Sequence, residues 1–83
     1  MKVLYFAWLR QRLGTAAEEF ELPAEVETVG DLIDWLRARG PAYAKGFAEP
    51  DVIAAAVNFE YVPFEHKISD RDEVAFFPPV TGG

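Results

Sequence analysis

The chain has 83 residues, of which 51% are apolar, 14% aromatic and 27% charged, and its formal net charge is −6. This length and composition predict one small folded domain and argue against disorder, while the acidic balance argues against nucleic-acid binding, which needs a basic face toward the phosphates. There is no cysteine, which excludes a disulfide, a thiolate metal site and a cysteine nucleophile, and suits a reducing, cytoplasmic location.

The first part of the chain predicts a β-hairpin. Residues 2–9 are rich in Val, Leu, Tyr, Phe and Trp with neither face polar, which is typical of a central strand. The run is too short to cross a membrane, and we expect no membrane segment. A loop or helical turn follows and ends at Gly14. Charged and apolar residues then alternate over residues 18–22, which indicates a half-buried second strand, antiparallel to the first.

A helix is expected to begin after Thr28, whose hydroxyl can cap free amide groups, with Asp31 completing a capping arrangement. Gly40 and Pro41 are typical of its end. One apolar stripe follows the helical period, at Val29, Leu32, Ile33 and Leu36. The stripe predicts that this helix packs across a sheet.

The rest of the chain predicts three further strands. Residues 41–51 look irregular, with a short helical turn near Tyr43. Strands are expected at residues 52–58, 61–62 and 73–77. The order predicts a two-layer α+β domain, with one main helix packed across a mixed sheet of about five strands. The last strand is expected in the middle, parallel to the first, because both are apolar on both faces.

Three segments resemble a known family. They are Phe-Ala-Trp-Leu-Arg at residues 6–10 followed by Gly14, Ala-Val-Asn at residues 56–58 with Tyr-Val at residues 61–62, and Asp-Glu-Val-Ala-Phe-Phe-Pro-Pro-Val-Thr-Gly-Gly at residues 72–83. They are similar to the small, sulfur-carrying subunits of molybdopterin synthase, which have the ubiquitin-like β-grasp fold. Two positions depart from the family pattern. Arg71 replaces a common glycine, and Phe59 replaces a common polar residue and widens an apolar surface.

The resemblance implies that Gly83 carries the chemistry. A ubiquitin-activating-type adenylyltransferase would use ATP to adenylate the Gly83 carboxylate, and a sulfurtransferase or cysteine desulfurase would supply sulfur to form a thiocarboxylate. The large catalytic subunit would then pass this sulfur to cyclic pyranopterin monophosphate, in a heterotetramer of two small and two large subunits. The chain would bind no permanent cofactor and would not be catalytic alone.

The domain is expected to span residues 1–77, followed by a flexible tail at residues 78–83. The tail comprises Pro78, Pro79, Val80, Thr81, Gly82 and Gly83. Extended, it would reach at most ~20 Å. The prolines would hold its root away from the sheet, and the glycines, which lack a Cβ, would let the carboxylate enter a narrow channel.

A partner surface is expected beside the tail, at Phe6, Arg10, Phe59, Phe76 and Phe77. Because Phe76 and Phe77 are adjacent in a strand, they point to opposite faces, so one must be core, and the sequence leaves open which. Phe6 and Trp8 would share one strand face. No metal site is expected, since Asp70 and Asp72 are typical of turns. The alternatives are a thiamine-pathway carrier, a ubiquitin-like modifier and a binding module with an inert tail.

Overall fold

The computed structural model describes residues 1–79. The elements are β1 (Lys2–Tyr5), α1 (Ala7–Leu13), β2 (Ala17–Glu19), α2 (Val29–Arg37), α3 (Pro41–Gly46), the 3-10 turn η1 (Pro50–Val52), β3 (Ala54–Val57), β4 (Glu60–Val62) and β5 (Glu73–Phe77). The five strands form one sheet in the order β2-β1-β5-β3-β4. Strand β5 is therefore central, as the sequence predicts.

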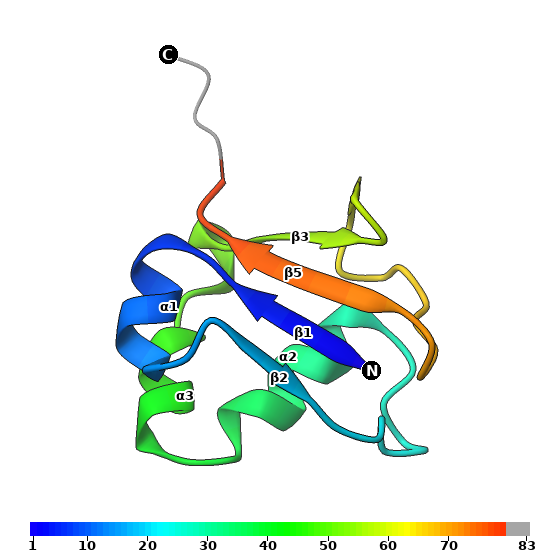
Figure 1. Cartoon of the computed structure of the whole chain (residues 1–83), viewed down its shortest axis with the longest axis horizontal. Coiled ribbons are helices and arrows are strands. Elements are labelled where there is room, and N and C mark those ends of the chain that lie inside the picture. Colours follow the sequence, from blue (N-terminus) through cyan, green and yellow to red (C-terminus); the bar gives the residue numbers. More distant parts are fainter. Residues whose placement is uncertain (80–83) are drawn as a thin grey trace.

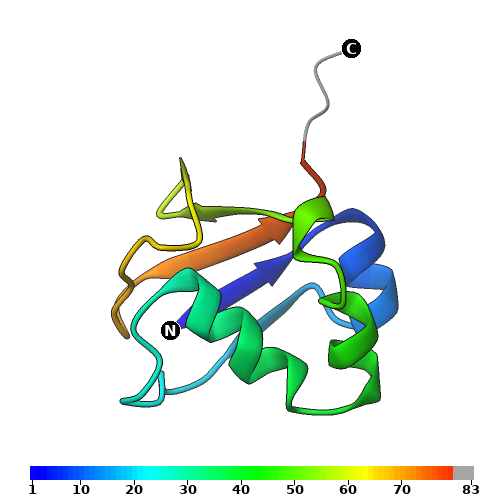
Figure 2. The ribbon, with the colours of Figure 1, turned by 180° about the vertical axis from the view of Figure 1, so that it is seen from behind.

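The sheet is mixed. Strand β5 is parallel to β1 and antiparallel to β3, while the pairs β1–β2 and β3–β4 are both antiparallel. Helix α2 crosses one face of this sheet, and the opposite face carries no helix among residues 1–79 (Figures 1 and 2). The predicted two-layer α+β architecture is confirmed.

The core lies between α2 and the covered face of the sheet. Alternate residues of the central strands point inward and are fully or almost fully buried: Val3 and Tyr5 of β1, and Val74 and Phe76 of β5. The predicted apolar stripe of α2 meets them, and its residues Val29, Leu32, Ile33 and Leu36 are all at most 2% exposed. The helical and strand periods in the sequence therefore identify the core correctly.

Helix α2 begins as expected. The Asp31 amide donates to Thr28 Oγ1 at 3.1 Å, and the Thr28 amide donates to Asp31 Oδ2 at 3.2 Å, which completes a reciprocal capping box. The expected end of the helix is wrong: α2 stops at Arg37, and Pro41 is the first residue of α3. Proline suits a first helical position because its missing N–H would have no helical partner there.

The predicted first strand is too long. Strand β1 ends at Tyr5, and α1 begins at Ala7, which has a positive φ of 55°. The helix ends at Gly14, whose φ is 75°. Helix α1 buries Leu9 completely and packs against α3. Tertiary packing thus overrides the strand-like composition of residues 6–9.

Candidate functional site

The root of the tail is held by the centre of the sheet. Phe77, the last residue of β5, pairs with Ala54 of β3, and the Phe6 amide donates to the Phe76 carbonyl oxygen at 3.1 Å. Pro78 is half-buried and Pro79 is exposed. The chain therefore leaves the sheet from a strand that is paired on both sides. The predicted tail residues Val80, Thr81, Gly82 and Gly83 lie outside the described residues.

The structure separates the two adjacent phenylalanines of β5. Phe76 is 0% exposed, and its ring packs edge-on against Phe47 with 5.2 Å between ring centroids. The expectation that Phe76 lies at a partner surface is therefore wrong, because the side chain fills the core. Phe77 points to the opposite face, where it is half-buried.

The face of the sheet opposite α2 carries a cluster that we call the outer apolar patch. It consists of Phe6, Ala56, Phe59, Tyr61, Ala75 and Phe77, which with Glu73 line a hollow of about 300 Å³. Three of its aromatic side chains are largely exposed: Phe59 at 88%, Tyr61 at 69% and Phe6 at 47%. Exposed apolar clusters of this kind mark interaction sites more often than chance positions.

Strand register explains the shape of the patch. Ala56 pairs with Ala75 on one side and with Tyr61 on the other, so small side chains form the floor. The Tyr61 and Phe77 rings stand beside it in a T-shaped arrangement, with centroids 5.2 Å apart. Small residues between aromatic ones leave a recess that an apolar side chain of a partner can fill.

Phe59 owes its exposure to a tight turn. Asn58 and Phe59 link β3 to β4 and have positive φ values of 50° and 72°, as a two-residue type I′ hairpin requires. The Asn58 side chain braces the turn, since its Oδ1 accepts from the Glu73 amide and its Nδ2 donates to Asp72, both at 3.0 Å. A bulky residue such as Phe59 is unusual in this conformation.

The two carboxylates of the neighbouring loop accept hydrogen bonds from backbone amides. The Ser69 amide donates to Asp72 at 2.8 Å, and the Leu22 amide donates to Asp70 at 2.7 Å; these bonds lower the pKa of both aspartates below the ordinary value. Asp72 acts as a turn former, as expected. Asp70 does not: its bonds to the Leu22 amide and, at 3.1 Å, to the N-terminal amine of Met1 join this loop to distant parts of the chain. Among residues 1–79, no group of three or more His, Cys, Asp and Glu side chains is placed to hold a metal ion.

Arg10 and Trp8 lie elsewhere than the sequence suggests. Arg10 is exposed on α1, not on a strand, and does not line the hollow of the outer apolar patch. Trp8 does not share a face with Phe6, because the chain turns into α1 between them. A role for Arg10 in partner binding stays a prediction.

Sequence reasoning missed Tyr61 and the alanine floor of the patch. The signal that could have revealed them is the alternation of side chains between the two faces of a strand. Ala75 and Phe77 are two apart on β5, and Tyr61 follows the exposed turn by two residues, so all three share a face once the register is known. The register itself depends on long-range pairing that the sequence does not display.

A mixed sheet with a central parallel pair, crossed on one face by a helix, defines a ubiquitin-like β-grasp protein. The chain belongs to the ThiS family, whose model matches residues 3–83. No helix within residues 1–79 is long and apolar enough to span a membrane.

Similar proteins cover the chain over its whole length. It is 45% identical to the molybdopterin synthase sulfur carrier subunit of Escherichia coli K12, over 100% of this chain and 99% of that protein. It is 34% identical to the Haemophilus influenzae protein of the same name, with the same coverage. The Haloferax volcanii SAMP1 structure superimposes with a TM-score of 0.75 at 31% identity, over 100% of this chain and 98% of that one.

Proposed function

We propose that this chain is the sulfur carrier subunit of a molybdopterin synthase, in the biosynthesis of the molybdenum cofactor, and that it carries sulfur on Gly83. The observation that carries the proposal is the full-length similarity to the Escherichia coli sulfur carrier subunit at 45% identity. The Phe-Phe-Pro-Pro-Val-Thr-Gly-Gly sequence of residues 76–83 supports it, since it is the strongest part of the resemblance to this family.

The chemistry follows from the weakness of a carboxylate as an electrophile. A Gly83 oxygen would attack the α-phosphorus of ATP on an adenylating enzyme, release pyrophosphate and form an acyl-adenylate. A protein persulfide would then attack the carbonyl carbon and expel AMP. A thiol would cleave the resulting acyl disulfide and leave a thiocarboxylate. Its sulfur is nucleophilic at neutral pH, so this chain needs no cysteine of its own.

The domain would serve to present this group. The root at Pro78 leaves a strand that is paired on both sides, so its position is fixed relative to the outer apolar patch. The large synthase subunit would dock on the patch, with Phe77 and Phe59 as anchors, while the tail reaches into that subunit's active site. The adenylating enzyme and the sulfur donor would meet the same tail in earlier steps.

The test is the intact mass of the chain after incubation with the adenylating enzyme, ATP and a sulfur source. We expect an increase that corresponds to replacement of one oxygen by sulfur, located at Gly83 by fragmentation. Addition of the large subunit and cyclic pyranopterin monophosphate should return the mass to its original value. A chain that never gains sulfur, or cannot pass it to the pterin, contradicts the proposal.

The matched control is a chain that lacks Gly82 and Gly83. It should gain no sulfur, yet unfold at the same temperature as the full chain, because we propose that residues 1–77 form the complete folded domain. Continued sulfur loading without the glycines would place the reactive group elsewhere. A large fall in the melting temperature would show that the tail belongs to the fold.

A second candidate function is that of a ubiquitin-like modifier. The similarity to Haloferax volcanii SAMP1, whose name stands for small archaeal modifier protein 1, favours this candidate. Digestion of cellular proteins followed by mass spectrometry would reveal isopeptides between Gly83 and lysine. Such isopeptides would support the modifier, whereas sulfur transfer to the pterin supports the carrier. Transfer of the sulfur into a thiamine precursor would instead identify a thiamine-pathway carrier.

A further inference from the structure

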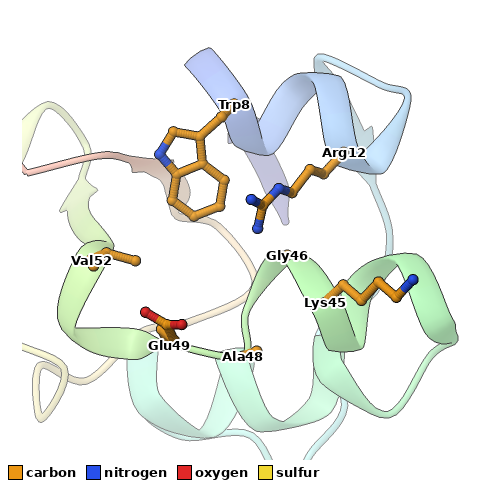
Figure 3. A pocket seen from close by; sticks show the side chains of 7 residues that line it. All are labelled: Trp8, Arg12, Lys45, Gly46, Ala48, Glu49 and Val52. Carbon is orange, nitrogen blue, oxygen red and sulfur yellow. The ribbon is translucent and has the colours of Figure 1, made fainter.

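A second recess lies on the helical side of the molecule, between α1 and the segment from α3 to η1 (Figure 3). It has a volume of about 320 Å³ and is lined by Trp8, Arg12, Lys45, Gly46, Ala48, Glu49 and Val52. A neighbouring hollow shares Arg12, Lys45 and Ala48 with it, and the two together form what we call the helical groove. The groove has no lining residue in common with the outer apolar patch.

The close approach of α3 to α1 shapes the floor of the groove. Gly46 is buried, and a Cβ at this position would lie 3.2 Å from Leu13 Cδ2 and 3.4 Å from Leu9 Cδ2. Glycine therefore lets the end of α3 settle against α1. This packing brings Arg12 of α1 and Lys45 of α3 to one groove.

The charge of the groove differs from that of the rest of the chain. The protein has 8 Lys and Arg against 14 Asp and Glu, yet Arg12 and Lys45 form no ion pair among residues 1–79. The Arg12 guanidinium instead lies over the Trp8 ring, 4.7 Å from its centroid. The Arg12 guanidinium points into the recess, and Lys45 lies at its edge with its ammonium directed away (Figure 3). Positive charge at a recess of an acidic protein complements a negatively charged ligand.

The opposite end of the groove limits what that ligand can be. Glu49 lies across the recess from Arg12, between Ala48 and Val52 (Figure 3), and its carboxylate disfavours a second negative charge. Trp8 and Val52, which is 40% exposed, add apolar surface at that end. The groove therefore fits one carboxylate beside one apolar side chain better than it fits a polyphosphate.

We propose that the helical groove binds a segment of a partner protein in which an acidic side chain is next to an apolar one. The carboxylate pairs with the planar guanidinium of Arg12, and the apolar side chain packs on Trp8 and Val52. Lys45, whose ammonium points away from the recess (Figure 3), adds only longer-range positive charge. Val52 precedes β3, whose Ala54 pairs with Phe77, so this end of the groove lies near the root of the tail. That the partner is a protein acting on Gly83 rests on the proposed function; the binding of the segment itself does not.

The experiment is an NMR titration of the isotope-labelled full chain with the capped peptide acetyl-Leu-Asp-Leu-amide. Shifts are expected at the Trp8 indole N–H and at the amides of Arg12, Gly46 and Ala48. The same peptide with Asn in place of Asp should bind about tenfold more weakly, as should the Asp peptide to Arg12→Gln, since a hydrogen bond to a charged group is lost. Lys45→Gln should weaken binding less, and Arg71→Gln, on a distant exposed loop, not at all.

Three results would overturn the inference: no shifts at these residues, equal binding of the Asn peptide, or an equal or stronger response of the same residues to AMP or inorganic phosphate. The last would identify a general anion site. Melting curves of both groove variants must match that of the wild type. If the loss of Arg12 disturbs Trp8, Lys45→Gln still tests the groove, because it leaves the contact between Arg12 and Trp8 intact. Sulfur loading at Gly83 is measured separately, so failure of the groove inference leaves the carrier proposal intact, and the reverse also holds.

Discussion

The two faces of β5 are both apolar but are covered differently. On the inner face, Val74 and Phe76 are 0% exposed beneath the helices. On the outer face, Ala75 and Phe77 are only half-buried, and no helix within residues 1–79 covers them. Apolar character alone therefore does not distinguish a face that is buried in the core from one that stays exposed. The side on which the helices pack determines which of the two apolar faces is buried.

The two faces also differ in how their aromatic rings are held. Phe76 lies in a close-packed cluster with Phe47, which in turn contacts Tyr5 edge-on at 6.3 Å. The outer rings lie around a recess, and Phe59 is held out by a turn in which a bulky residue is strained. This strain costs stability, and the docking that we propose for the large subunit would account for it.

The largest expected effect is a difference between the two adjacent phenylalanines in how much each contributes to the free energy of unfolding. Phe76→Ala should lower the free energy of unfolding by about 3–5 kcal/mol, because it leaves a cavity in a buried cluster. Phe77→Ala should lower it by less than about 1.5 kcal/mol, since its ring is half-exposed already. Urea denaturation followed by circular dichroism measures both. Equal losses in the two variants would remove the distinction between core and docking face.

The second expected effect is on binding of the large synthase subunit. Phe77→Ala should weaken the large synthase subunit's affinity by about 2 kcal/mol or more, close to thirtyfold in Kd, if the ring is a central anchor. Isothermal titration calorimetry gives this number directly. Phe64→Ala is the matched control, because it truncates a half-buried phenylalanine beside Gly30 of α2, outside the patch. Similar losses of affinity in both variants would argue against the patch.

The third effect concerns the polar edge of the inner face. The Tyr5 hydroxyl donates to Glu18 Oε2 at 2.7 Å, and that oxygen also pairs with Arg39 at 3.2 Å. Burial, followed by the hydrogen bond to Glu18, raises the pKa of Tyr5 above its ordinary value of 10.0. The unfolded chain therefore releases this proton first, and stability should fall above about pH 10, by up to about 1.4 kcal/mol per pH unit.

Tyr5→Phe tests this assignment. Its free energy of unfolding should be lower near neutral pH, because a hydrogen bond is lost, but should fall less steeply above pH 10. Urea melts between pH 8 and about 11 measure the slopes. Identical alkaline slopes for Tyr5→Phe and the wild type would exclude Tyr5 as the responsible group.

Local patterns predicted most of the fold. The stripe of α2, its Thr28–Asp31 capping box and the span of β5 were all confirmed. The central place of β5 was also predicted, because a strand that is apolar on both faces belongs in the middle of a sheet. These features depend on residues close in sequence or on the composition of single strands.

Features that depend on distant contacts could not be predicted. Residues 6–9 resemble a strand, but α1 forms there because Leu9 is buried and α1 packs against α3. The faces of Phe76 and Phe77 and the membership of Tyr61 in the patch required the strand register. The helical groove depends on the contact of Gly46 with Leu13, far apart in the chain.

The smallest expected effect tests why the outer face keeps a strained aromatic residue. Phe59→Gly should stabilise the protein by about 0.5–1 kcal/mol, because glycine adopts the positive φ of 72° without steric cost. The same change should weaken binding of the large subunit, because it removes a side chain that is 88% exposed on the patch. Urea denaturation and calorimetry measure the two quantities independently.

Phe59→Ala distinguishes the effect of the backbone conformation on stability from the effect of the ring on binding. Alanine also lacks the ring but keeps the steric cost of a left-handed conformation, so it should bind as weakly as the glycine variant without its gain in stability. If Phe59→Ala bound like the wild type, the ring would not be an anchor. If Phe59→Gly were less stable than the wild type, the ring would support the fold, and the outer face would be an extension of the core. Opposite signs of the changes in stability and affinity at this one position would therefore be the most specific evidence that the outer face serves binding.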